Sequence, residues 1–231
     1  MISIDNISYY LGERILYEDA SLFITPKDKI GLIGLNGTGK STLLKMLVGE
    51  VELASGNISQ SKSTSIGFLN QDLLSYQSDE PILEVAMQAF HQALDLQHQI
   101  DVILKEMEEN YTDKLLERLS LLQEQFEAAD GYRIQSQAEE LLEGIGFKTA
   151  DLKRPLREFS GGWRMRVMLA KLLLEKPSLL MLDEPTNHLD LPSIQWIESY
   201  LQSYEGAYII VSHDRTFLNS TVNKIVEVYA S

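Results

Sequence analysis

Short apolar runs and turn residues alternate through the first part of the chain, a pattern typical of β-strands. One of these runs, Lys29–Ile33, leads directly into glycines, as expected of a buried strand that feeds a loop and then a helix over 40–48. A turn is predicted at Ser55–Asn57, because Ser, Gly and Asn favour turn conformations. The predicted strands of this part are Ile2–Ile7, Ser21–Ile24, Lys29–Ile33 and Ser65–Leu69.

The middle of the chain has its apolar residues at helical spacing instead. The repeat forms two series, separated by a turn with a helix N-cap at Asn110–Asp113. Two helices joined by so short a turn are expected to pack antiparallel as an arm over 83–130, with their apolar stripes facing each other. A third helix is predicted at Ile134–Glu143, and the whole inserted helical subdomain at 80–158.

The last third of the chain alternates between apolar strands and helices. Helices are predicted at Arg164–Glu175 and Pro192–Ser203, and buried strands at Leu179–Leu182 and Tyr208–Val211, with a further strand at Lys224–Val228. Alternation of this kind predicts an α/β fold with a mostly parallel, helix-covered sheet. The length of 231 residues fits one domain, 1–231, that carries the helical insertion.

Composition and charge exclude several classes of protein. The formal net charge is −14, and the stretch 80–143 alone has fifteen acidic and four basic residues, so the chain is not a basic nucleic-acid clamp. Its lack of cysteine excludes disulfides, thiol catalysis and zinc–thiolate sites. Neither a membrane-spanning apolar run nor a secretory signal is found, so we expect a cytoplasmic protein without membrane insertion.

The segment Gly34–Ser41 fits the pattern G-x-x-x-x-G-K-[ST] and lies between a predicted buried strand and a predicted helix. Glycines let successive backbone N–H groups point at phosphates, and the helix N-terminus adds partial positive charge. Lys40 is expected to reach the β- and γ-phosphates, and the Ser41 hydroxyl to ligate Mg²⁺. This strand–loop–helix context favours a phosphate-binding loop over a chance glycine-rich turn.

Two further segments carry candidate chemistry. The buried strand Leu179–Leu182 ends in Asp183 and Glu184; the first carboxylate is expected to hold Mg²⁺, and the second to orient or deprotonate an attacking water. On its own, such a strand end could equally be a helix N-cap. The segment Phe159–Trp163, with Ser160, Gly161 and Gly162, opens a predicted helix and suits either an anion site or a simple helix cap.

These motifs occur together in the order and spacing of the ATP-binding-cassette (ABC) ATPases, which the chain resembles. The runs Phe159–Arg166, Leu182–Asp190 and Ser212–Phe217 more narrowly resemble the ABC-F subfamily, especially the first of its two cassettes. The resemblance covers essentially the whole chain. It implies a P-loop NTPase cassette with a mostly parallel, helix-covered sheet, an N-terminal antiparallel β subdomain and an inserted helical subdomain with a helical-hairpin arm.

The resemblance also implies a role for each matching position. Ser160, Gly161 and Gly162 would contact the γ-phosphate of ATP held by an opposite cassette, and Asp190 would lie in the loop that crosses this interface. The residues implied to hold ATP on the cassette itself are Gly34, Leu35, Asn36, Gly37, Thr38, Gly39, Lys40, Ser41 and Thr42.

Catalysis and metal binding are implied for a second group of positions. Glu184 is the catalytic base, His213 the γ-phosphate switch, and Gln71 the residue that senses Mg²⁺ and the attacking water. Ser41, Gln71 and Asp183 would hold the Mg²⁺. The cofactors implied are therefore ATP and Mg²⁺.

The sequence departs from the family pattern in three respects. The aromatic residue that stacks on adenine usually precedes the glycine at Gly12; here that position is Leu11, so Tyr10 is the better candidate. Trp163 replaces the glutamine of the general signature, in agreement with first cassettes of the subfamily. Each motif occurs once, so we expect this chain to be a single-cassette fragment of a longer protein.

The function that the resemblance implies is Mg²⁺-dependent ATP hydrolysis in a site completed by a second cassette. The leading hypothesis is a ribosome-associated factor that acts in translation or in ribosome protection. Its arm would touch the ribosome or tRNA, either at ribosomal protein or through a few cations. Those cations are Lys105, Lys114 and Arg118. The alternatives are an ATP-binding subunit of an ABC transporter and a module that binds ATP without hydrolysing it. A transporter subunit would have a shorter helical segment. A module that binds ATP without hydrolysing it would have lost Lys40, Glu184 or His213.

Overall fold

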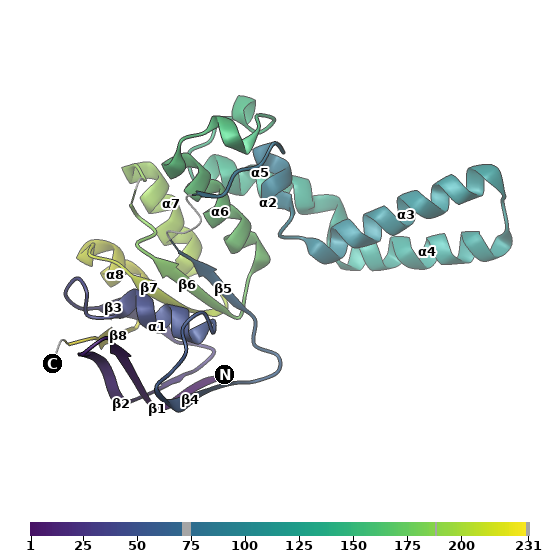
Figure 1. The fold of residues 1–231 in the computed structure, drawn as a ribbon. Helices are drawn as coiled ribbons and strands as arrows, with labels where there is room; N and C mark the ends of the chain where they lie inside the picture. Colours follow the sequence, from purple (N-terminus) through teal and green to yellow (C-terminus); the bar gives the residue numbers. More distant parts are fainter. Residues whose placement is uncertain (71–74, 188, 230–231) are drawn as a thin grey trace. The chain divides into compact units, whose positions relative to one another are not determined.

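The computed structural model describes residues 1–70, 75–187 and 189–229. The chain divides into two compact units, of which the first comprises residues 1–76 with 176–231 and the second residues 77–175 (Figure 1). The predicted insertion 80–158 and arm 83–130 both fall within the second unit.

The first unit contains a five-stranded parallel sheet and a three-stranded antiparallel sheet. The parallel sheet has the order β5-β6-β7-β3-β8, and every adjacent pair in it is parallel. The antiparallel sheet has the order β2-β1-β4. The strands are β1 (Ile2–Leu11), β2 (Arg14–Ile24), β3 (Lys29–Ile33), β4 (Ser55–Gln60), β5 (Ile66–Leu69), β6 (Leu179–Asp183), β7 (Ala207–Val211) and β8 (Lys224–Glu227). The predicted α/β cassette fold is confirmed.

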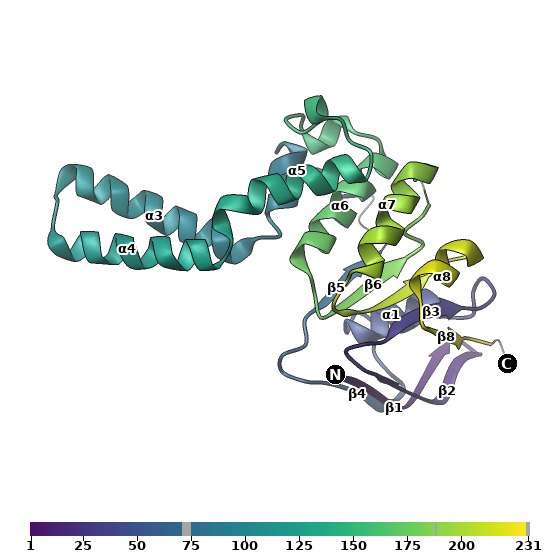
Figure 2. The same cartoon turned by 180° about the vertical axis from the view of Figure 1, so that it is seen from behind.

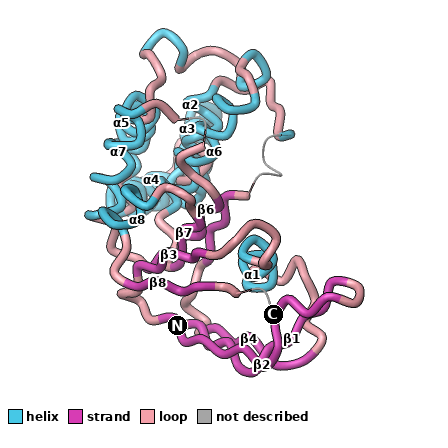
Figure 3. The backbone as a smooth tube through the Cα atoms, turned by 90° about the vertical axis from the view of Figure 1, so that its left-hand side faces the viewer, coloured by secondary structure: helices cyan, strands magenta, loops and turns pink. Residues whose placement is uncertain are grey.

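Helix α1 (Lys40–Leu47) lies between the two sheets of this unit, while α7 (Leu191–Gln202) and α8 (Arg215–Thr221) lie on the other face of the parallel sheet (Figures 2 and 3). All residues of β6 and β7 are buried, which explains why these strands are continuously apolar rather than alternating. One apolar cluster joins α1 to both sheets through residues such as Leu44, Ile7 and Ile209. The loop before α1 is therefore held against a rigid core.

The turn predicted at Ser55–Asn57 is wrong, because these residues begin β4. Only Ile58 of this strand is even partly buried, so the strand has no apolar alternation that could have signalled it. Pairing with β1, in which Ile58 lies opposite Ile4, makes the segment a strand. Gly56 has a φ of 86° beside an irregularity in this pairing, where a side chain would meet the backbone of Asn6.

The second unit is helical. Its long helices α3 (His91–Glu109) and α4 (Asp113–Ala128) form an antiparallel hairpin, and their apolar stripes meet as predicted around Ile103, Leu122 and Phe126. Its other α-helices are α2 (Ile82–Met87), α5 (Ile134–Gly144) and α6 (Gly161–Glu175). None of the helices in the described part of the chain has the length and apolar character needed to cross a membrane.

The hairpin begins at His91, later than the predicted arm start at residue 83, because α2 is a separate short helix. Ile82, Val85 and Ala86 of α2 are fully buried, and α2 packs against α5 and α6. The N–H groups of Ile82 and Leu83 also donate to backbone carbonyls of the segment that precedes α6. These contacts hold α2 against α5, α6 and the segment that precedes α6. The helical spacing of the sequence continues past Phe90, although the structure has a break between α2 and α3 there.

Candidate functional site

The loop between β3 and α1 has a backbone that only glycine adopts readily at several positions. Gly37 and Gly39 have φ values of 78° and 105°, in the left-handed region. At Gly34, whose φ is 150°, a Cβ atom would lie 2.4 Å from the Val228 carbonyl oxygen. Larger residues would therefore force this loop away from the core and from the N-terminus of α1.

Lys40 is the first residue of α1 and lies across the loop that precedes it. Its Nζ donates hydrogen bonds to the carbonyl oxygens of Gly34 and Leu35, at 2.9 and 3.0 Å. The residue is only 8% exposed. Two neutral carbonyls do not neutralise the charge of a buried ammonium, so an anion bound at this loop would stabilise it.

A cavity of about 470 Å³ opens beside this loop and combines the two motifs predicted to act together. Its size lies in the range of small-molecule sites. It is lined by Leu11, Leu16, Asn36, Gly37, Gly39, Lys40, Ser41, Thr42, Asp183, Glu184, Asn187, Val211 and His213. The loop and the start of α1 supply backbone N–H groups, an ammonium and two hydroxyls, and the segments at the ends of β6 and β7 supply two carboxylates and an imidazole.

Asp183 and Glu184 reach the cavity because β6 ends at its rim. Asp183 is the last residue of β6 and is 8% exposed, and it lies opposite Val211 of β7. The Glu184 N–H donates to the Val211 carbonyl at 2.9 Å, and the φ of Glu184 is 51°, a left-handed conformation rare for a side-chain-bearing residue. This turn points two adjacent carboxylates into one cavity.

Burial raises the pKa of Glu184 above its ordinary value, and the charges of His213 and Lys40 oppose that shift. The Nε2 atom of His213 lies 3.4 Å from a carboxylate oxygen of Glu184. The side chain of Glu184 is 15% exposed and that of His213 60%. A partly desolvated carboxylate beside an imidazole is typical of acid–base chemistry.

Some predicted residues do not line this cavity. The structure places Leu11 in the lining and Tyr10 outside it, although Tyr10 is the residue that the sequence favoured as a stacking group. Gly34, Leu35 and Thr38 support the loop from outside the lining; the Thr38 hydroxyl donates to the Leu35 carbonyl at 2.9 Å. Gln71 lies outside the described residues.

Several residues at the site were not predicted from the sequence. Leu16 and Asn187 line the cavity, and the hydroxyl of buried Tyr17 donates to the Gly39 carbonyl at 2.9 Å. Leu16 and Tyr17 lie on β2, far from the motifs in sequence, and no local pattern indicates their place. Asn187 lies within the conspicuous run after Glu184, which was the available signal.

The residues Ser160, Gly161 and Gly162 lie in the second unit, at the start of α6. The Ser160 carbonyl accepts the Arg164 N–H at 2.9 Å, so Ser160 immediately precedes the helix and the two glycines form its first turn. Trp163 follows and packs edge-on against Phe147, with ring centroids 4.9 Å apart. The first N–H groups of this helix have no intrahelical partners, as in any helix N-terminus.

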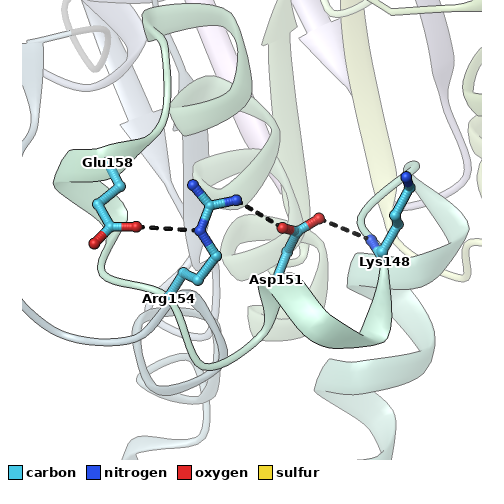
Figure 4. A network of polar contacts seen from close by, with 4 residues as sticks. All are labelled: Lys148, Asp151, Arg154 and Glu158. Carbon is cyan, nitrogen blue, oxygen red and sulfur yellow. Dashed lines mark hydrogen bonds and ion pairs between the residues drawn. The ribbon is translucent and has the colours of Figure 1, made fainter.

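An ion-pair network orders the segment before Ser160 (Figure 4). Arg154 donates to Asp151 at 2.8 Å and to Glu158 at 3.1 Å, and its guanidinium lies 4.7 Å from the ring centroid of Phe159. The Lys148 N–H donates to the other oxygen of Asp151. The hydrogen bond from Arg154 is the largest cause that lowers the pKa of Asp151. Asp190, in the first unit, precedes α7 and accepts a hydrogen bond from the Ser193 hydroxyl.

Comparison with known proteins identifies the family. The family model described as "ABC transporter" matches residues 17–187, which include the loop before α1 and the two carboxylates at the end of β6. The chain belongs to the ABC transporter family.

Similar members of the ABC transporter family include proteins from bacteria and a plant. The chain is 38% identical over 231 residues to the uncharacterized ABC transporter ATP-binding protein YfmM of Bacillus subtilis, covering 99% of the chain and 44% of that protein. It is 36% identical over 228 residues to the probable ATP-binding protein YheS of Escherichia coli (99% and 34% covered). It is also 36% identical over 233 residues to ABC transporter F family member 5 of Arabidopsis thaliana (98% and 33% covered).

These matches confirm the resemblance to F-family cassettes, and the chain spans less than half the length of the relatives named. Among solved structures, an ATP-binding subunit of an ABC transporter gives a TM-score of 0.69 at 17% identity, covering 100% of this chain and 88% of that one. A dimeric ATP-binding cassette in a post-hydrolysis state, bound to ADP and phosphate, gives 0.68 at 18% identity (100% and 97% covered). At such identities these likenesses establish the fold.

Proposed function

We propose that this chain binds ATP with Mg²⁺ in the cavity beside α1 and hydrolyses it. The observation that carries the proposal is the convergence, in one cavity, of a glycine loop at a helix N-terminus with Lys40 and of the carboxylates Asp183 and Glu184. The donor set fits a triphosphate, because amides and an ammonium face acceptor-rich phosphate oxygens. Leu11 and Leu16 offer the apolar surface against which the nucleoside would lie.

The donor set also fits Mg²⁺. The ion prefers oxygen ligands and is usually held by one or two protein oxygens together with substrate phosphates and water. Ser41 and Asp183 line the cavity and supply a hydroxyl and a carboxylate, and Gln71 would add a third ligand. No group of three acidic, His or Cys side chains able to hold a metal occurs among the described residues. Bound Mg²⁺ would supply charge neutralisation at the phosphates.

In the proposed reaction, side chains of this protein position the phosphates and the attacking water, and one of them accepts a proton. Lys40 and the N–H groups of the loop hold the phosphates, and Glu184 accepts a proton from the attacking water or orients it. His213, whose Nε2 lies 3.4 Å from a carboxylate oxygen of Glu184, would hold that carboxylate and lie beside the terminal phosphate. Gln71 would orient the same water.

The proposed site is completed by a second cassette. Ser160, Gly161 and Gly162 present a helix N-terminus, which would contact the γ-phosphate of ATP held by the other cassette. Asp190 would lie at the same interface. The second cassette would come from the same full-length protein or from another copy of this chain.

Lys40→Ala tests the nucleotide site. We expect ATP affinity to fall by about tenfold to a hundredfold, because a hydrogen bond from a charged group contributes about 1.5–3 kcal/mol. Lys62→Ala, which removes the same charge from an exposed turn, is the matched control. Isothermal titration calorimetry measures both. Equal ATP affinities of the wild type and Lys40→Ala would overturn the proposed site.

We further propose that the protein acts on ribosomes. F-family members are among its relatives, and the family resemblance links that subfamily to translation. The α3–α4 hairpin is the proposed contact. It contains nine acidic residues and three basic ones, so a basic ribosomal protein is a better match than RNA phosphates.

Gradient sedimentation of a source-cell lysate, with and without a non-hydrolysable ATP analogue, tests the partner. Antibody detection of this segment in the ribosomal fractions, strengthened by the analogue, is the expected result. Recovery in the membrane fraction would refute the ribosomal proposal and favour an ATP-binding subunit of a transporter. ATP binding is measured separately, with the purified chain. Recovery in the membrane fraction would therefore not contradict the proposed nucleotide site.

A further inference from the structure

Tyr17 connects the antiparallel sheet to the phosphate loop, although no motif includes it. The residue lies on β2 and is 8% exposed, within the apolar cluster that also contains Leu43 and Leu44 of α1. Its hydroxyl donates to the Gly39 carbonyl at 2.9 Å in a buried environment. Its ring lies against Gly39 as well: a Cβ atom on that glycine would be 3.1 Å from Cε2 of Tyr17.

The Gly39 carbonyl is held by two donors. One is the Leu43 N–H at 2.9 Å, the ordinary helical bond of the first turn of α1. The other is the Tyr17 hydroxyl, which approaches from the core. Burial raises the pKa of Tyr17, so this hydroxyl keeps its proton, and its role as donor, throughout the neutral range.

A fixed carbonyl fixes the next amide too. In a planar trans peptide the C=O of one residue and the N–H of the next point in opposite directions. The Gly39 carbonyl points at Tyr17 in the core, so the Lys40 N–H points away from Tyr17. Lys40 and Gly39 both line the cavity, and the first N–H groups of a helix have no intrahelical partner.

We propose that Tyr17 is a positioning residue for phosphate binding: its hydroxyl sets the Gly39–Lys40 peptide plane so that the Lys40 N–H faces the phosphates. The inference rests on the proposed ATP site. Gly39 adopts a left-handed conformation with φ 105° and ψ 9°, and glycine has the widest choice of alternative backbone conformations. A second donor on its carbonyl removes that freedom before the nucleotide binds.

Tyr17→Phe tests the proposal, because it removes the hydroxyl and keeps the ring. The matched control is Tyr204→Phe. Tyr204 is also 8% exposed, and its hydroxyl also donates to a buried backbone carbonyl, that of Pro177. That bond lies at the amino end of β6, whereas the cavity lies at the carboxyl end. Both variants lose the same kind of bond, and only one lies beside the loop.

Calorimetry with Mg–ATP should give a dissociation constant on the order of fivefold higher for Tyr17→Phe than for the wild type. Tyr204→Phe should stay within about twofold, while both variants show comparable decreases in Tm without nucleotide. In ¹⁵N-resolved spectra, the Lys40 amide of Tyr17→Phe should shift less on saturation with Mg–ADP. Equal ATP affinities of the two variants, or an unchanged Lys40 amide response, would overturn the inference.

The wild-type titration separates the two proposals. If the wild type binds no ATP, the proposed site itself fails. If the wild type binds and Tyr17→Phe binds equally well, only the positioning role fails. Should Tyr17→Phe not fold, the wild-type spectrum still decides, because a Lys40 amide that does not respond to saturating Mg–ADP contradicts its proposed direction.

Discussion

At the scale of single residues, Glu184 has the environment that most clearly differs from that of an ordinary glutamate. It is partly buried near His213 and Lys40, just after the end of β6. We predict that Glu184→Gln lowers ATP turnover by on the order of a hundredfold to a thousandfold, because the amide cannot accept the proton of the attacking water. Phosphate release assays measure this. Glu205→Gln is the control, and equal turnover by Glu184→Gln would refute the role as base.

The same variant has a predicted effect on stability. A carboxylate whose pKa is raised on folding stabilises the fold when it is protonated, and this contribution is lost as the pH rises through the raised pKa. Above that raised pKa, Glu184 is therefore an unfavourable, partly buried charge. We expect the Tm of nucleotide-free Glu184→Gln to exceed that of the wild type above the raised pKa and the difference to shrink in acid, below the ordinary glutamate pKa. Thermal scans across pH test the sign.

Leu11 and Tyr10 are neighbours on β1 with different surroundings, since only Leu11 lines the cavity. We predict that Leu11→Ala weakens ATP binding by about threefold to tenfold, because part of an apolar contact with the nucleoside is lost. Tyr10→Ala serves as the control and should change the affinity less than about twofold. Titration with Mg–ATP distinguishes the two variants. A larger loss of ATP affinity in Tyr10→Ala than in Leu11→Ala would assign the stacking role to Tyr10.

At the scale of elements, the α3–α4 hairpin depends on its connecting turn as well as on its apolar seam. The Thr112 side chain caps α4 by accepting the Leu115 N–H at 3.2 Å. Loss of such a cap costs about 1 kcal/mol, so Thr112→Ala should speed hydrogen exchange in the first turn of α4 by about fivefold. Ser120→Ala in mid-helix is the control. Unchanged exchange in both variants would show that the cap contributes nothing.

The two units also make the hairpin and the nucleotide site separable in experiments. The cavity lies entirely within the first unit, and the hairpin lies entirely within the second. ATP affinity is thus expected to be the same for Thr112→Ala and the wild type. This separation allows ribosome binding and nucleotide binding to be tested by different variants.

At the scale of the whole molecule, one chain carries one phosphate loop and one Ser160–Gly162 segment. If these act on opposite nucleotides, turnover per chain should rise with protein concentration, because the active form is a pair of cassettes. Glu184→Gln should give a dimer that depends on ATP, measured by light scattering after size exclusion. Turnover independent of concentration, by a species that stays monomeric with ATP, would contradict the two-cassette site.

The sequence alone determined the features that depend on local chemistry. The phosphate loop needs glycines, a lysine and a hydroxyl close together in the sequence, and β6 needs a continuous apolar run before the two carboxylates at its end. Both patterns can therefore be recognised in the sequence. The boundaries of α1, β6 and β7 differ from the predicted ones by at most one residue. The parallel sheet followed from the alternation of apolar strands and helices.

Only the tertiary structure decided the features that depend on contacts between distant segments. Strand β4 has no apolar alternation and exists through its pairing with β1, and α2 separates from the hairpin because it packs on α5 and α6. That Leu11 lines the cavity and Tyr10 does not depends on which face of β1 meets the cavity. Tyr17 reaches Gly39 across 22 residues of sequence, and no spacing rule relates a strand residue to a loop that folds against it.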